Sequence, residues 1–232
     1  MDGVFLIDKP VGLTSHDVVA RVRRSLGGVK TGHAGTLDPF ASGLLLVLVG
    51  RATRIQQRLM GLPKRYETVA QLGATSTTGD PEGEIVVTGR LPPDRSKIGQ
   101  PPLPTGEIRQ RPPMHSAVKI EGERAYKRAR RGERFEMPER IVTVNRFEQL
   151  WREEGTQPGG LGRAGFLIEC SSGTYVRSLI ADLHDAYCLE LRRTAIGPFE
   201  VGDAVPPPAR GGERETPQPP EPLAIEQVLA LL

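Results

Sequence analysis

The chain of 232 residues has few of the side chains that build metal centres or disulfide frameworks. It contains two cysteines, Cys170 and Cys188, and four histidines, and it has no Cys-x-x-Cys pair. Two cysteines cannot form a disulfide framework, and the histidines do not have the spacing of metal ligands. We therefore expect no metal, no cofactor and a reduced, cytoplasmic compartment.

The sequence also lacks long apolar runs. None approaches the roughly 18 to 20 residues that a membrane-spanning helix needs. The N-terminus, Met1-Asp2-Gly3, has no basic leader, so neither a secretory signal nor membrane association is expected. With 38% hydrophobic and 25% charged residues, the composition is that of a globular protein with ample material for a core.

The net charge of +3 is too small to indicate a nucleic-acid partner, but the charge is unevenly distributed. Residues 119–134 carry a net charge of +4, so the rest of the chain carries −1. The basic residues of this segment are Lys119, Arg124, Lys127, Arg128, Arg130, Arg131 and Arg134, and the acidic ones are Glu121, Glu123 and Glu133. Such a concentration is typical of a surface that contacts phosphates. The alternative is a salt-bridged surface helix, for which three acidic partners are few.

One stretch, residues 32–43, combines three glycines, a histidine and an Asp-Pro turn in the sequence GHAGTLDPFASG. The apolar run that follows, residues 44–49, predicts a strand buried on both faces. Asp38 would then lie on a tight loop anchored to the core, since glycine permits positive φ and proline stiffens a turn. A carboxylate held in this way suits a nucleophile or a general base. The alternative is an aspartate that only caps its own turn.

Hydrophobic periodicity and turn residues predict the remaining elements. Further strands are expected over 4–7, 64–72, 141–150 and 166–170, and helices over 15–26 with Ser15 as N-cap, 51–60, 174–187 and 223–232. Irregular segments are expected at the proline-rich stretch 90–106, at the loop 153–165 and at a tether over 204–222.

The stretch GHAGTLDP at 32–39 resembles the catalytic motif of the TruB family of tRNA pseudouridine synthases. Shorter matches follow at DKP (8–10), KRY (64–66) with 75–83, GTYVR (173–177) and LRRT (191–194). The resemblance implies an α+β pseudouridine synthase fold with a mixed, mainly antiparallel sheet flanked by helices and loops. It also implies a catalytic domain over 1–203 with an inserted thumb at about 107–140. Residues 204–232 would be a Pro-rich tether and a C-terminal helix, without a complete PUA domain.

The same resemblance assigns roles to individual side chains. Asp38 would be the nucleophile that converts a T-loop uridine, at tRNA position 55, into pseudouridine. The residues assigned to the substrate are His33, Tyr66, Tyr175, Arg177 and Leu191. His33 would fill the space left by the flipped base, Tyr66 would stack on that base, and Arg177 would pair with Asp38. Lys9 and Pro10 would support the active-site loop, and the thumb residues Lys119, Lys127, Arg128, Arg130 and Arg131 would contact RNA.

Several alternatives remain open from the residues themselves. Apart from the resemblance, Tyr66 is interpreted as an ordinary strand residue and Arg177 as a surface residue of a helix. The chain departs from the family at 90–106, where a helix is usual, and between Asp182 and Leu191, where it is shorter. Other functions to weigh are a non-catalytic RNA-binding module, a hydrolase with an aspartyl nucleophile, a guide-RNA-dependent relative, and a synthase that acts on another RNA. We expect tRNA as the partner, no obligatory protein partner, and a monomer.

Overall fold

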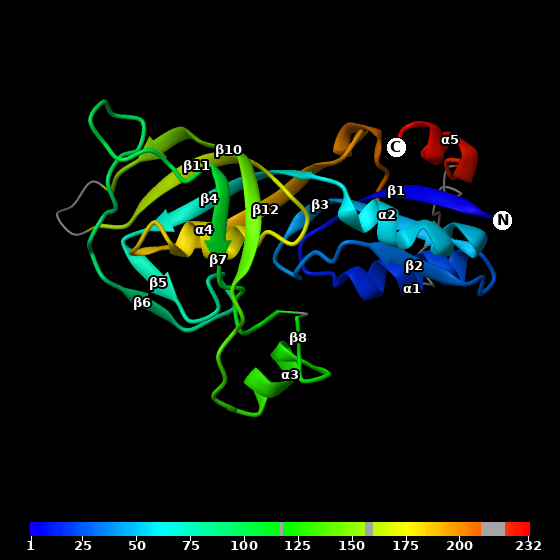
Figure 1. The fold of residues 1–232 in the computed structure, drawn as a ribbon, viewed down its shortest axis with the longest axis horizontal. Helices are drawn as coiled ribbons and strands as arrows, with labels where there is room; N and C mark the ends of the chain where they lie inside the picture. The colour runs from blue at the N-terminus through cyan, green and yellow to red at the C-terminus, as the bar shows by residue number, and fades with distance from the viewer. Residues whose placement is uncertain (117, 156–159, 210–220) are drawn as a thin grey trace. The chain divides into compact units, whose positions relative to one another are not determined.

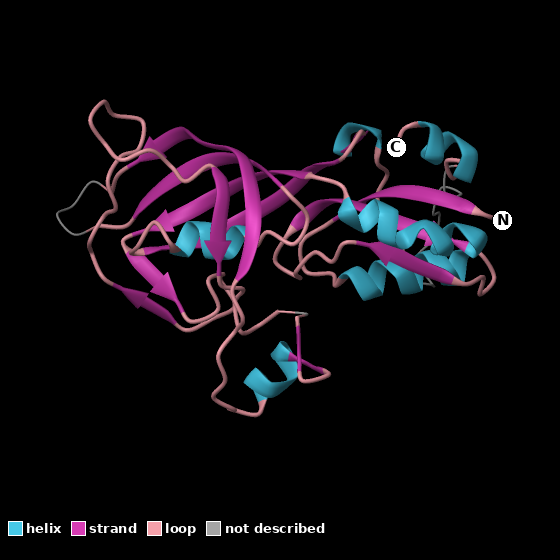
Figure 2. Ribbon diagram, viewed as in Figure 1, coloured by secondary structure: helices cyan, strands magenta, loops and turns pink. Residues whose placement is uncertain are grey.

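The computed structural model describes residues 1–116, 118–155, 160–209 and 221–232. The chain forms two compact units, one of residues 1–66 with 191–232 and one of residues 67–190. Each unit contains strands and short helices, as the α+β prediction requires (Figure 2). Among the described helices, none combines the length and the apolar character that crossing a bilayer requires.

The sheet of the first unit is built around β3 (Ser42–Val49). Its antiparallel neighbours are β1 (Gly3–Lys9) and β2 (Thr31–Ala34). A parallel neighbour, β12 (Ala186–Ile196), pairs Arg192 with Ser42 and Arg193 with Gly43 and then turns into β13 (Phe199–Glu200). The sheet is therefore mixed, and the prediction of a doubly buried strand over 44–49 is confirmed because none of its six side chains is exposed.

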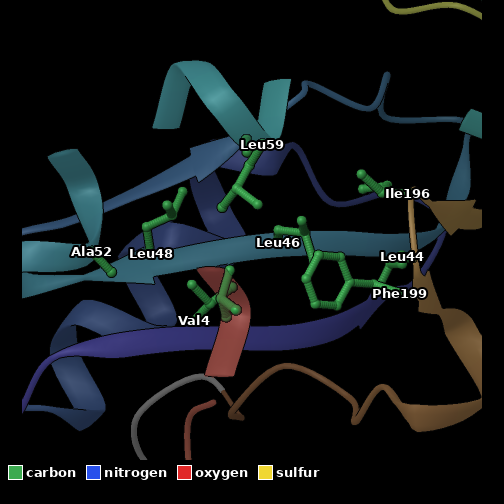
Figure 3. Packing of buried hydrophobic residues seen from close by; sticks show 10 residues of the cluster. Val4, Leu44, Leu46, Leu48, Ala52, Leu59, Ile196 and Phe199 are labelled. Atoms are coloured by element: carbon green, nitrogen blue, oxygen red, sulfur yellow. The ribbon is translucent and has the colours of Figure 1, made fainter. Parts of the chain in front are cut away.

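Helices cover both faces of β3 in the first unit (Figure 1). On one face, α1 (Ser15–Ser25) packs Val18 and Val22 against Leu45, Val47 and Val49. The opposite face is covered by η1 (Gly50–Ile55), α2 (Gln56–Gly61) and α5 (Ile225–Ala230). Figure 3 shows the cluster on that face, to which β3 contributes Leu44, Leu46 and Leu48. Burying each leucine stabilises the unit by about 1.5 to 3 kcal/mol, so β3 is a rigid base for the loop that precedes it.

The start of α1 differs from the prediction by one residue. Thr14, not Ser15, is the N-cap, and its hydroxyl accepts a hydrogen bond from the Asp17 N–H at 3.0 Å. Asp17 in turn accepts from the Thr14 N–H at 2.9 Å, which completes a capping box. The prediction of Ser15 as N-cap is wrong, because its side chain is buried and is used elsewhere.

The segment after β13 is tied to β1 at both described ends. A short turn, η2 (Val201–Asp203), leads to Val205, which exchanges backbone hydrogen bonds with Leu6 and Asp8 at 3.1 and 2.8 Å. Leu223 pairs with Val4 in the same way before α5 begins. Within the predicted tether over 204–222, Val205 is therefore held against β1, whereas Leu223 lies beyond that range. The tether itself stays a prediction, and its residues 210–220 lie outside the described chain.

The second unit contains a sheet in the order β4-β11-β10-β7. Its strands are β4 (Lys64–Leu72), which begins in the first unit, β7 (Gly106–Gln110), β10 (Arg140–Glu153) and β11 (Gly162–Cys170). Two hairpins accompany it, β5 (Ala74–Ser76) with β6 (Ile85–Val87) and β8 (Lys119–Ile120) with β9 (Glu123–Arg124). The helices are α3 (Ala125–Arg130) and α4 (Val176–Ala181).

Two elements of the second unit differ from the prediction. The loop predicted over 153–165 is shorter, because β10 extends to Glu153 and β11 already begins at Gly162; residues 156–159 lie outside the described chain. The helix predicted over 174–187 ends at Ala181. His184 and Asp185 then take positive φ values of 63° and 46°, which end any helical path and turn the chain into β12. Tyr187 is therefore a strand residue, although its spacing from Leu183 also fits a helix.

The proline-rich segment 90–106 has no helix or strand before Gly106, as predicted, but it is not a free linker. Side chains of β10 hold its first half. Gln149 donates to the Asp94 carboxylate at 2.7 Å and accepts from the Arg95 N–H at 3.2 Å, and Arg152 donates to the Pro92 carbonyl at 2.9 Å. Hydrogen bonds from the Ser96 hydroxyl and from Gln149 lower the pKa of Asp94 to about 2.

Candidate active site

Asp38 lies in the loop between β2 and β3, where it is half-buried between the buried side chains of Leu37 and Phe40. Its backbone carbonyl accepts a hydrogen bond from the Ala41 N–H at 3.1 Å, which closes a tight turn. Both apolar side chains are buried. The turn therefore displays the carboxylate while the residues on either side hold the chain down.

The residue before Asp38 is held by α1. The Ser15 hydroxyl accepts from the Leu37 N–H at 2.9 Å and donates to the Leu37 carbonyl at 3.1 Å. Ser15 is itself buried, so this reciprocal pair is shielded from water. From the sequence, Ser15 is predicted only as the cap of the helix.

The residue after Asp38 is held by the end of β1 and the turn that follows. The Gly12 N–H donates to the Pro39 carbonyl at 2.8 Å. The Lys9 ammonium, whose side chain is fully buried, approaches the same carbonyl at 3.5 Å and donates to the carbonyls of Pro10 and Leu13 at 2.9 and 2.7 Å. Lys9 thus contacts the loop that the resemblance expects it to support, whereas the exposed Pro10 contributes a carbonyl.

The two ends of the loop meet at Arg193 of β12. Its guanidinium donates to the carbonyls of Gly35 and Thr36 at 3.0 and 3.4 Å and to that of Leu44 at 2.8 Å. The neighbouring Arg192 instead points to Asp8, with two hydrogen bonds of 3.0 and 2.7 Å. The sequence motif at 191–194 predicts no role for either arginine, so the sequence analysis missed both.

The other predicted residues of the first unit lie on its strands. His33 is half-buried on β2, its ring centroid is 6.3 Å from that of His16, and its carbonyl accepts from Gln56 at 2.8 Å. Tyr66 on β4 and Leu191 on β12 are each 8% exposed. Stacking of a base on Tyr66 would thus require more of the ring to be uncovered than it is here.

Arg177 lies at the start of α4 in the second unit and is only 4% exposed, so its interpretation as a surface residue is wrong. Its guanidinium forms a buried ion pair with Asp80 at 2.6 Å and donates to the Thr78 carbonyl at 3.2 Å and the His115 carbonyl at 2.9 Å. It therefore joins the turn after β5 to the start of the thumb. The expected pairing of Arg177 with Asp38 stays a prediction.

Asp80 is fixed in turn by its own loop. One carboxylate oxygen accepts from the Thr78 hydroxyl at 2.6 Å and from the Glu82 N–H at 3.0 Å, and the other accepts from Arg177. The sequence placed Asp80 within a matching motif but did not select it. A buried carboxylate opposite a buried arginine cannot be read from spacing, because the two lie 97 residues apart.

Tyr175 is held by two residues that the sequence did not single out. The amide of Gln110, at the end of β7, accepts from the Tyr175 N–H at 2.8 Å and donates to the Tyr175 carbonyl at 3.0 Å. Arg140, which faces Gln110 across the β7–β10 pair, places its guanidinium 5.5 Å from the centre of the Tyr175 ring. The half-buried ring is thereby oriented by the two strands at the base of the thumb.

The thumb contains more internal ion pairs than its composition indicated. Arg128 pairs with Glu121 at 3.2 Å and with Glu133 at 2.8 Å. Arg131 pairs with Glu123 at 2.7 Å and with Glu133 at 2.6 Å. The hydrogen bond from Arg131 lowers the pKa of Glu123, and the hydrogen bonds from Arg128 and Arg131 lower the pKa of Glu133. The argument that acidic partners are too few is therefore wrong for these two arginines, since Glu133 serves both.

The remaining basic side chains of the thumb stay available for phosphates. Among the described residues, Lys119, Lys127 and Arg130 form no such ion pair, and all three are exposed. Arg130 lies 5.7 Å from the centre of the Tyr126 ring, which orients its charge without cancelling it. The described chain also contains no group of three or more His, Cys, Asp or Glu side chains that could hold a metal ion.

Comparison with known proteins decides the family. Residues 23–176 match the model of the TruB family pseudouridylate synthase N-terminal domain. The chain belongs to the TruB family of pseudouridylate synthases. It is 43% identical over 215 residues to tRNA pseudouridine synthase B of Corynebacterium efficiens, with 88% of this chain and 70% of that protein covered. It is 46% identical over 214 residues to the Thermobifida fusca protein of that name, covering 88% and 72%.

Solved structures of similar fold agree with this assignment. A chain in the crystal structure of a Cbf5-Nop10-Gar1 complex matches with a TM-score of 0.59 and 33% identity, over 85% of this chain. A chain from an H/ACA RNP bound to a substrate RNA containing 2′-deoxyuridine matches with a TM-score of 0.55 and 29% identity, also over 85%. This TruB-family chain spans about half the length of those two chains, 50% and 48%. The pseudouridine synthase fold predicted from the sequence is confirmed.

Proposed function

We propose that this chain isomerises uridine 55 in the T-loop of tRNA to pseudouridine, with Asp38 as the nucleophile. The observation that carries the proposal is the Asp38 loop itself. In a chain of the TruB family, the residue before this carboxylate is held by the buried Ser15 side chain. The residue after it is held by the Gly12 N–H, and the buried Lys9 ammonium lies 3.5 Å from the same carbonyl. A nucleophile needs such fixed placement, since an error of about 1 Å in a reacting group can lower a rate about a hundredfold.

The reaction needs a base that has left the T-loop stack. Extruding a uracil costs a few kcal/mol, and side chains that replace or stack on the base lower this cost. In the proposal His33 fills the vacated space, while Tyr66, Tyr175 and Leu191 contact the flipped base. Arg177, at the start of α4, stabilises the ionised form of Asp38.

Asp38 then attacks the nucleotide at C6 of the base or C1′ of the sugar. This attack forms a covalent bond between the carboxylate and that carbon. The C1′–N1 bond breaks, the base rotates, and a C1′–C5 bond forms. The bond to Asp38 breaks again, either as C5 displaces the carboxylate from C1′ or as the carboxylate leaves C6, so free Asp38 is regenerated. The proton leaves C5 and N1 gains one, so the product is an isomer of the substrate. No net electron transfer takes place, and the protein supplies the nucleophile, the position and the exclusion of water.

In the proposed domain organisation, residues 1–203 are catalytic and the thumb at about 107–140 grips the T-stem-loop. The exposed thumb residues Lys119, Lys127 and Arg130 carry the phosphate contacts. Arg128 and Arg131 first hold the thumb together through Glu121, Glu123 and Glu133. Arg128 and Arg131 contact RNA only where a phosphate replaces these carboxylates as the partner of the guanidinium group.

The test is to incubate the purified chain with an unmodified tRNA transcript and to map pseudouridine by carbodiimide-blocked primer extension. A stop at position 55 that depends on the protein is expected. Binding without any stop would favour a passive RNA-binding module, and stops in other RNAs but not in tRNA would favour another substrate. The matching solved chains come from complexes with other proteins or RNA. We propose that this chain acts as a monomer without a protein partner, so activity of the chain alone is part of the expected result.

Replacing Lys127 and Arg130 together by alanine should weaken tRNA binding and reduce its dependence on salt. Each lost phosphate contact lowers the slope of log K against log salt concentration by about 0.7 to 0.9, so the double variant should lose about 1.4 to 1.8. The single variant Arg131→Ala should change the slope less, because that arginine is already paired with Glu123 and Glu133. Filter binding over a salt series measures these slopes.

The matched control is Arg23→Ala with Arg24→Ala, which removes two exposed arginines from α1. Its slope should equal that of the wild type. Equal slopes for the thumb and control variants would show that the thumb side chains are only a solvated surface.

Tyr66→Phe should bind tRNA nearly as well as the wild type but turn it over at least a hundredfold more slowly. The hydroxyl is the only group removed, and it could help to take the C5 proton; assistance of this kind is worth about 10²- to 10⁴-fold. Tyr66→Leu should also lose stacking, worth about 1 to 3 kcal/mol in binding. Single-turnover kinetics and a binding assay separate the two effects. If both variants react like the wild type, Tyr66 is an ordinary strand residue.

A further inference from the structure

Arg193 has the largest fully buried side chain among the described residues, with 1% of it exposed. Burying a guanidinium is costly unless its N–H groups are hydrogen-bonded. Within the described chain no carboxylate forms an ion pair with Arg193. Its partners are the backbone carbonyls of Gly35, Thr36 and Leu44.

These three carbonyls lie at the two ends of the loop that carries Asp38. Gly35 and Thr36 precede the aspartate, at the end of β2, and Leu44 follows it, in β3. One planar guanidinium therefore spans the entry and the exit of the loop. Its fork of donors fixes the distance between them, which a flexible ammonium cannot do in the same way.

Two glycines make this close approach possible. Gly43 pairs with Arg193 in the parallel ladder and has φ of 104°, and a Cβ there would lie 2.3 Å from the Arg193 carbonyl oxygen. Gly35 has φ of 87°, and its Cβ would lie 3.4 Å from the Arg193 guanidinium. Both backbone shapes favour glycine, so the loop is shaped around this arginine at both ends.

Ser15 holds the middle of the same loop. Its hydroxyl both accepts from the Leu37 N–H and donates to the Leu37 carbonyl, one residue before Asp38. Arg193 and Ser15 come from different elements, β12 and α1, and approach the loop at different points. Together they restrain the position of the carboxylate without being required to touch a substrate.

We infer that Arg193 and Ser15 are positioning residues for the nucleophile Asp38, an inference that rests on the proposed function. Their contacts place the Asp38 carboxylate for attack, so their loss lowers the rate of the chemical step while tRNA binding and folding stay intact. A merely structural role would lower stability and would leave the rate of the folded protein unchanged.

The experiment compares Arg193→Lys and Ser15→Ala with Val22→Ala, a matched control that removes buried apolar contacts of α1 in the same unit. Three quantities are measured for each. These are the single-turnover rate of pseudouridine formation at saturating tRNA, the Kd for tRNA in an Asp38→Asn background that prevents turnover, and the melting temperature. The wild type is assayed first, so an inactive wild type counts against the proposed function and not against this inference.

Arg193→Lys should lower the single-turnover rate at least tenfold, and Ser15→Ala should lower it severalfold, with Kd within threefold of the wild-type value. Val22→Ala should melt at a lower temperature but react at the wild-type rate. An active wild type with Ser15→Ala and Arg193→Lys rates within twofold of it would overturn the inference. The inference would also be overturned if Ser15→Ala and Arg193→Lys lost no more of the single-turnover rate than Val22→Ala does when their melting temperatures fall by the same amount. If Arg193→Lys does not fold, the Ser15→Ala comparison decides by the same criteria.

Discussion

Asp38→Asn is expected to abolish pseudouridine formation and to leave the affinity for tRNA within a few-fold of the wild-type value. The amide has the shape of the carboxylate, so the turn closed by Ala41 and the contacts of Leu37 and Pro39 should survive. An amide is a far weaker nucleophile than an ionised carboxylate, so the step that detaches the base should stop. A drop of at least a thousandfold in the single-turnover rate is the expected size, about 4 kcal/mol in the activation barrier.

The measurement has two controls. The melting temperature should stay close to that of the wild type, because the half-buried carboxylate is replaced by a group of equal size. Asp17→Asn on α1 removes a comparable carboxylate from an exposed capping box and should react normally. Activity of Asp38→Asn within tenfold of the wild type would remove Asp38 from the mechanism, and full activity of Asp38→Ala would do so even more plainly.

Asp80→Ala is expected to destabilise the protein by about 3 to 5 kcal/mol, the usual cost of removing one partner of a buried ion pair. Asp80 and Arg177 have side chains that are each 4% exposed, and they meet at 2.6 Å. The substitution also removes the acceptor of the Thr78 hydroxyl and of the Glu82 N–H. The turn that follows β5 should loosen together with the start of the thumb, because Arg177 also binds the His115 carbonyl.

Urea denaturation of the purified variants measures this loss. Asp80→Asn should recover little of it, because its single amide oxygen can accept either from Arg177 or from Thr78 and Glu82, but not from both sides, and the amide carries no charge to balance the guanidinium. Arg90→Ala is the control, since the Arg90–Asp185 pair is 3.0 Å long but its arginine side chain is 76% exposed, and surface pairs contribute about 0 to 1 kcal/mol. Equal losses for Asp80→Ala and Arg90→Ala would mean that the buried pair contributes no more than a surface one.

The sequence predicted best where one short segment carries the whole signal. The strand over 64–72 has the predicted bounds. The run 44–49 forms the body of β3, because an unbroken apolar run of that length indicates a strand that is buried on both faces. The prediction failed where the same spacing of apolar residues fits both a helix and another structure. Leu183 and Tyr187 fit one face of a helix, but the positive φ of His184 and Asp185 places a turn between them.

The sequence by itself determined the family, the fold class and the loop that bears Asp38, because a contiguous motif with glycines and proline restricts its own backbone. Only the tertiary structure decided what holds that loop. Arg193 reaches Gly35 across 158 residues, and Gln110 reaches Tyr175 across 65. It also decided which charges of the thumb are paired, since Glu133 contacts both Arg128 and Arg131. Composition counts charges but does not say which of them meet, since a hydrogen bond or an ion pair depends on where the folded chain brings two side chains.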